Sequence, residues 1–163
     1  MPLSAGKPKV SPPSADYLKF LSAYEPRITR LALLVRTLVL EEAPQAVELL
    51  YDAYNAVAAG YSFTGRPGDA FIHIAAYSQW VNLGFQRGSE LEDPHHLLQG
   101  GGRWIRHIRI ADPADLNRPG VRALVKAAVE RAKRPEGELE GSGKSVVRAV
   151  YPKRRRPAGS SGN

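Results

Sequence analysis

The sequence predicts an α+β fold, in which an antiparallel sheet of about four or five strands is covered on one face by N-terminal and C-terminal helices. Helical spacing of apolar residues is confined to the two ends of residues 15–133, and the stretch between them has strand-like composition and alternation. Strands that follow one another without intervening helices form a meander, so a two-layer sandwich is expected. A chain of 163 residues is one domain's worth and can bury its own core.

Two helices are predicted at the start of this domain. Ser14 is placed to cap the first helix, with Asp16 in its first turn. Pro26 suits the first turn of the second helix, where its missing N–H costs nothing. The second helix has apolar residues at spacings of three and four and ends before Pro44, so we expect it to be the central core helix. These apolar residues are Ile28, Leu31, Leu34, Val35, Leu38 and Val39.

Five segments after Pro44 have the composition of strands. They are residues 47–55, 57–64, 71–77, 81–87 and 104–110. The Gly-Arg-Pro-Gly bend at 65–68 separates the second segment from the third. In the fourth, Val81, Leu83 and Phe85 alternate with polar or small residues, which is typical of a sheet with one buried face.

A third helix closes the domain, and a tail flanks each end. Asp112-Pro113 opens a turn, and a buried stripe of apolar residues follows from Val121 to Val129. Residues 1–14 and 134–163 are rich in proline, glycine, serine and charge, so we expect both tails to be disordered. Within the second tail, residues 146–151 form a short island of β-type residues.

The formal net charge of +7 lies mostly in the tails. Residues 15–133 carry 14 basic and 13 acidic side chains, which argues against a dedicated nucleic-acid surface on the body. The run Lys153–Arg156 predicts only a weak, salt-dependent attraction to nucleic acid or acidic proteins. The absence of cysteine excludes disulfides and thiolate chemistry and fits a cytoplasmic protein. No apolar run has the length of a membrane span, so no membrane partner is expected.

Three stretches resemble the YdhG-like family of small bacterial proteins, also called domain of unknown function 1801. They are LLYDAYNAVAAGYS, DAFIHIAAYSQWVNLGFQRGSELEDPHHLLQGGGRWIRHI and the late VYPKRRRP. The resemblance covers roughly Tyr17 to Lys133 and implies the same α+β layout. One branch of the family is described as a frataxin-like iron chaperone, which implies Fe(II) as a ligand. That branch has a Trp-Gly…Pro…Tyr pattern where this chain has the residues of 51–55, Tyr-Asp-Ala-Tyr-Asn, which places it in a different branch.

Potential metal ligands gather in and after the acidic turn. Glu90, Asp93 and His96 offer the carboxylate and imidazole donors that iron(II), manganese and zinc accept. His107, which matches the family's Arg-His-Ile, lies mid-strand among arginines that keep an imidazole neutral and suited to a ligand. These four residues predict weak Fe(II) binding. The alternative is a solvated turn in which Asp93, before Pro94, caps backbone N–H groups while His107 is a packed strand residue.

The glycine-rich bend is a second candidate site. Gly101, Gly102 and Arg103, with Arg106 close by, predict an anion site built from backbone N–H groups and guanidinium groups. The bend lacks the Lys-Ser/Thr pair of a phosphate loop, so the alternative is a flexible connection into the next strand.

Three functions are compatible with these features. The first is a non-enzymatic binding protein that handles ferrous iron weakly, in the manner of a chaperone. The second is an interaction module, monomeric or homodimeric, that presents a sheet face or the 100–104 bend to a protein or nucleic acid. The third is a small enzyme for an anionic substrate, which requires Arg103, Arg106 and His107 to converge in one pocket. Covalent catalysis has no support from a Gly-x-Ser-x-Gly elbow or a cysteine.

Overall fold

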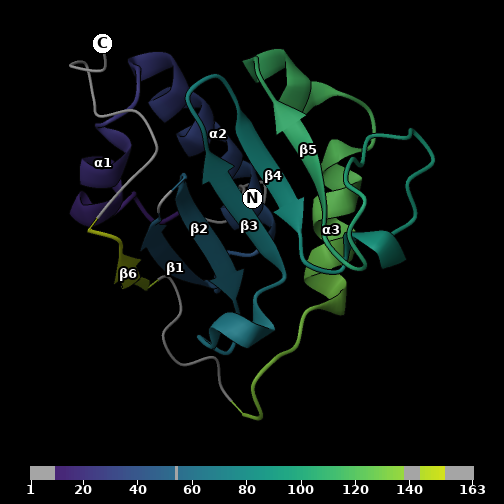
Figure 1. Cartoon of the computed structure of the whole chain (residues 1–163). Helices are drawn as coiled ribbons and strands as arrows, with labels where there is room; N and C mark the ends of the chain where they lie inside the picture. Colours follow the sequence, from purple (N-terminus) through teal and green to yellow (C-terminus); the bar gives the residue numbers. More distant parts are fainter. Residues whose placement is uncertain (1–9, 54, 138–143, 153–163) are drawn as a thin grey trace, which may run out of the picture.

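The computed structural model describes residues 10–53, 55–137 and 144–152 (Figure 1). The described strands form one sheet in the order β5-β4-β3-β2-β1-β6. They are β1 (Val47–Asp52), β2 (Val57–Ser62), β3 (Ile72–Ala76), β4 (Val81–Phe85), β5 (Arg106–Ile110) and β6 (Ser145–Val150). Each of β1 to β5 pairs antiparallel with its neighbour in sequence, so the predicted α+β class and the meander are present in this part of the sheet.

Helices cover one face of the sheet (Figure 1). The described α-helices are α1 (Ala15–Leu21), α2 (Pro26–Glu42) and α3 (Val121–Arg131), and the short 3-10 helices are η1 (Pro67–Asp69), η2 (Gly88–Glu90) and η3 (Pro113–Asn117). The Ser14 side chain caps α1 by accepting the Tyr17 N–H at 3.1 Å, and Pro26 begins α2, as predicted. α2 packs against β3 and β4 and is the core helix. No described helix has the length and apolar character needed to cross a membrane.

The strands have two different faces. On the side of the helices, apolar residues such as Ile74, Leu83 and Ile108 are fully buried. The alternate residues of β3, β4 and β5 point to the other side, because successive side chains of a strand face opposite ways. We call this side the open face, and on these three strands its residues are His73, Ala75, Asn82, Gly84, His107 and Arg109.

The sheet differs from the prediction at the edge beside β1. Four or five antiparallel strands were expected, but the described sheet has a sixth strand, β6, which runs parallel to β1. β6 lies in the stretch 134–163 that was predicted to be disordered, so the domain does not end at residue 133. The β-type island pairs because β1 has a free edge: the Glu48 N–H donates to the Lys144 carbonyl at 2.8 Å, and the Tyr151 N–H to the Asp52 carbonyl at 2.9 Å. The basic run 153–156 lies outside the described residues.

A buried ion pair ties this edge to the core. Arg36 of α2 and Glu48 of β1 are almost fully buried, and the Arg36 Nε donates to Glu48 Oε2 at 2.8 Å. The same carboxylate accepts from the Tyr61 hydroxyl at 2.6 Å and from the Ser145 hydroxyl of β6 at 3.1 Å. Burial, with the nearby carboxylate second, raises the pKa of Tyr61 well above its ordinary value. A buried charge stays charged only with such partners, so this network links the edge strand β6, through Glu48, to Arg36 of α2.

The same arginine also holds the N-terminal segment. Its guanidinium donates to the carbonyl of Ser11 at 2.7 Å and to that of Pro12 at 3.3 Å. The predicted disorder of residues 1–14 is therefore wrong for residues 11 and 12, which accept hydrogen bonds from the core. Residues 1–9 lie outside the described residues.

Candidate functional site

The candidate site begins with two histidines that share one row of the open face. His73 of β3 lies opposite Gly84 of β4, and Gly84 lies opposite His107 of β5. The two imidazoles therefore flank a single glycine across three neighbouring strands. The residue types of this row were visible in the sequence, but their alignment depends on the register between strands.

Gly84 makes this arrangement possible. A Cβ atom at residue 84 would lie 2.0 Å from both Cε1 and Nε2 of His73, which means that the His73 ring covers the position a side chain would occupy. The other ring nitrogen, Nδ1, lies 2.5 Å from Gln86 Oε1. With the Gln86 oxygen accepting, Nδ1 carries the proton and Nε2 offers its lone pair above Gly84.

Both imidazoles are held in the neutral state. Burial lowers the pKa of His73 from 6.5, and the proximity of His107 lowers it further, while the hydrogen bond with Gln86 acts in the opposite direction. Burial also lowers the pKa of His107, and the positive charge of Arg109 adds to that effect. At neutral pH the pair can therefore donate and accept hydrogen bonds without adding charge.

A second row of polar groups lies beside the histidines. Arg109 is opposite Asn82, and its guanidinium carbon lies 4.0 Å from the centre of the Trp80 ring. Trp80 in turn stacks against Tyr77 with ring centres 5.4 Å apart. Among the described residues, no hydrogen bond or ion pair engages the Arg109 side chain. Its partner there is the Trp80 ring, through a cation–π contact.

Two buried polar atoms of this row lack partners. Asn82 Oδ1 and Trp80 Nε1 are both buried, and neither makes a hydrogen bond within the described part of the chain. A buried polar atom without a partner costs about 1–3 kcal/mol, so such atoms are rare outside sites that receive a ligand or water. An unpartnered acceptor and donor thus belong to Asn82 and Trp80, the two residues beside Arg109, which has no carboxylate partner among the described residues.

The open face carries no carboxylate within the six strands. The acidic residues of the strands are Glu48 and Asp52, and both are almost fully buried. They lie opposite Tyr61 and Val57, whose side chains belong to the core on the helix side. On β3, β4 and β5, the charge of the open face is therefore that of Arg109.

The four predicted metal ligands are not brought together. Glu90 Oε2 accepts from Arg131 at 2.8 Å, and its Oε1 lies 3.2 Å from Arg87. Both Asp93 carboxylate oxygens accept backbone N–H groups at 2.9 Å, from Leu97 and Leu98, so the capping alternative describes Asp93 correctly.

The two predicted imidazole ligands lie in different settings. His96 has a left-handed backbone with φ of 53° in the exposed turn, whereas His107 belongs to the open face. Within the described ranges, no group of three or more histidine, aspartate or glutamate side chains is placed to hold a metal ion.

The residues of the predicted anion site lie close together, but the Arg106 guanidinium is engaged by carbonyl groups of the bend. The residues Gly101, Gly102 and Arg103 are exposed, and the Arg103 guanidinium lies 4.9 Å from the Trp104 ring centre. Arg106 donates to the carbonyls of Gly102 and Ile105. Because Arg106 and His107 are adjacent in a strand, their side chains leave it toward opposite faces of the sheet.

Sequence reasoning did not single out His73, Trp80, Asn82, Gln86 or Arg109 as site residues. The sequence did contain a signal for them. Positions 80, 82, 84 and 86 alternate along the chain, as do 107 and 109, and alternate residues of a strand point to the same face of a sheet. Comparison of the chain with protein-family models, curated proteins and solved structures found no match. The resemblance to the YdhG-like family therefore remains a prediction based on the residues quoted for it.

Proposed function

We propose that this is a non-enzymatic binding protein that holds a small oxyanion-bearing ligand on the open face. Arg109 supplies the positive charge and lies over the ring of Trp80, whose buried N–H has no acceptor among the described residues. His107 and His73 extend the polar surface toward Gly84. This proposal combines two features that the sequence suggested separately: a non-enzymatic binding role and an anionic ligand.

The unpaired polar atoms are the observation that carries this proposal. An oxyanion accepts from Arg109 and from Trp80 Nε1, both of which lack an acceptor among the described residues. Asn82 Oδ1 needs a donor, and a protonated oxygen of hydrogen phosphate or a phosphate monoester provides one, whereas sulfate does not. The arrangement therefore favours a phosphate-type ligand over sulfate.

Ferrous iron is the alternative ligand, which the family resemblance implies. The lone pair of His73 Nε2 above Gly84, close to His107, is the observation in its favour. Against it stand the Arg109 charge beside His107 and the lack of a carboxylate on the open-face side of the strands. A cation gains little on such a surface, because imidazoles alone do not offset its repulsion from a guanidinium.

Calorimetric titration at neutral pH with hydrogen phosphate, sulfate and, under anaerobic conditions, Fe(II) tests this proposal. We expect hydrogen phosphate to bind in roughly the millimolar range and more tightly than sulfate. Replacing Arg109→Gln removes the charge-assisted hydrogen bonds and should weaken binding about tenfold or more. Arg118→Gln, at an exposed arginine outside the open face, is the matched control and should bind like the unmodified chain.

Two results would contradict the proposal. One is the absence of saturable hydrogen phosphate binding up to about 10 mM. The other is saturable Fe(II) binding that is lost in His107→Gln while hydrogen phosphate does not bind, because that combination identifies the imidazoles as cation ligands.

A further inference from the structure

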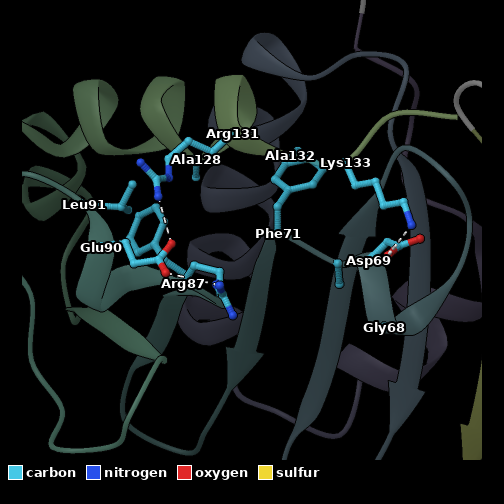
Figure 2. A pocket seen from close by; sticks show the side chains of 12 residues that line it. Gly68, Asp69, Phe71, Arg87, Glu90, Leu91, Ala128, Arg131, Ala132 and Lys133 are labelled. Atoms are coloured by element: carbon cyan, nitrogen blue, oxygen red, sulfur yellow. Dashed lines mark hydrogen bonds and ion pairs between the residues drawn. The ribbon is translucent and has the colours of Figure 1, made fainter.

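A second binding feature lies on the helix side of the sheet, and it shares no residue with the open face. It is a cavity of about 660 Å³ between the C-terminal end of α3, η1 and η2 (Figure 2). This volume lies within the range of sites that enclose small organic molecules.

The inner surface of the cavity is apolar. Phe71 projects toward Ala132 of the α3 end in Figure 2, and Leu91 and Ala128 line the opposite part. Ala128 and Ala132 present only methyl groups from α3, so the helix does not fill the space above the phenyl ring. Phe63 stacks on Phe71 with ring centres 4.9 Å apart, which holds that ring in place.

The rim of the cavity carries three ion pairs, two at one end and a longer one at the other. At one end, the Glu90 carboxylate is engaged by Arg131 at 2.8 Å and Arg87 at 3.2 Å. At the other, Lys133 Nζ is 4.0 Å from Asp69 Oδ1, and the Lys133 side chain is 67% exposed. Asp69 itself accepts a closer hydrogen bond from Thr64 at 2.7 Å. Lys133 is therefore the rim cation with the weakest engagement (Figure 2).

From this asymmetry we propose that the cavity binds an amphipathic organic anion with one carboxylate and an unbranched apolar tail. The carboxylate meets Lys133, and the tail extends over Phe71 toward Leu91. At the other end Arg131 and Arg87 already have Glu90 as their partner, so a second carboxylate would have to displace it to reach them. A single anionic head with an uncharged tail fits this distribution, and a dicarboxylate does not.

Titration with octanoate, butyrate and octanol, followed by calorimetry, tests both halves of the proposal. Octanoate should bind more tightly than butyrate, by up to about fourfold for each added methylene group. It should also bind more tightly than octanol, because octanol has the tail without the charge. Equal affinity for octanoate and butyrate, or for octanoate and octanol, would overturn the proposal.

Substitutions locate the site. Lys133→Gln should weaken octanoate binding several-fold and leave octanol unchanged, whereas Lys126→Gln, the same change on an exposed position of α3, should alter neither. Ala128→Leu fills the cavity and should remove octanoate and octanol binding together, with folding checked by circular dichroism. If Ala128→Leu does not fold, Leu91→Ala replaces it and should reduce the preference for octanoate over butyrate. Octanoate binding that is unaffected by Lys133→Gln contradicts the assignment, whatever the result for hydrogen phosphate at the open face.

Discussion

The open face and the α3 cavity contain similar side chains but use them in opposite ways. At the cavity, Glu90 is paired with two arginines and the unfilled element is apolar volume. At the open face, by contrast, Trp80 and Asn82 each have a polar atom without a hydrogen bond, and Arg109 has only the Trp80 ring as a partner, among the residues that the structure describes. The contrast shows that pairing, more than residue type, decides which polar groups are available to a ligand.

The largest effect is expected from breaking the buried Arg36–Glu48 ion pair, because both regions depend on a folded core. Arg36→Met leaves the Glu48 carboxylate buried without its cation and should lower the free energy of unfolding by about 3–5 kcal/mol. Urea denaturation measures this loss. The double substitution Arg36→Met/Glu48→Leu removes both charges and should recover most of it. A loss below about 1 kcal/mol for Arg36→Met would mean that Glu48 is not a buried charge in solution.

A smaller effect should distinguish the two regions. Each contains a glycine, and replacing the two glycines by alanine should cost different amounts of unfolding free energy. Gly84→Ala places a methyl group against the His73 ring and should cost about 1–3 kcal/mol of unfolding free energy. Gly68→Ala at the cavity meets no atom within 4 Å and should change stability by less than about 0.5 kcal/mol. Urea denaturation compares them, with Gly84→Ala/His73→Ala expected to recover part of the loss. Equal costs for the two glycines would refute the described position of the His73 ring.

The smallest effect is a difference in pH dependence. The pKa values of His73 and His107 are lowered in the folded protein, so the unfolded chain binds more protons below the ordinary value of 6.5. The unfolding free energy should therefore be constant above that pH and fall as the pH is lowered through it. Hydrogen bonding to Arg131 chiefly lowers the pKa of Glu90, so its contribution persists above 4.5 and is lost only below that pH.

Urea denaturation at a series of pH values separates these two windows. The double substitution His73→Gln/His107→Gln should remove the decline that begins near 6.5 and leave the acidic one. If the decline near 6.5 persists in the double variant, the two imidazoles are not its source.

Local signals in the sequence predicted most of the fold. Ser14 and Pro26 mark helix starts through their own capping and ring geometry, and the alternation around Leu83 marks a strand with one buried face. β6 escaped prediction because its partner, β1, is far away in the chain, and the glycine-rich connection gives no sign of where it leads. The same reason explains the site. His107 was a candidate, but only the pairing of three strands places it beside Gly84 and His73.

The position of β6 has a consequence for how the chain is made. The Ser145–Glu48 hydrogen bond spans 97 residues, whereas the four pairings among β1 to β5 each join strands that are adjacent in sequence. During synthesis, the meander and its helices are available to fold while the outer edge of β1 still has no strand beside it. That edge presents free N–H and C=O groups to any other extended segment, including a second nascent copy on the same message. Synthesis of β6 therefore closes this edge of the sheet and ends a period in which β1 is open to association.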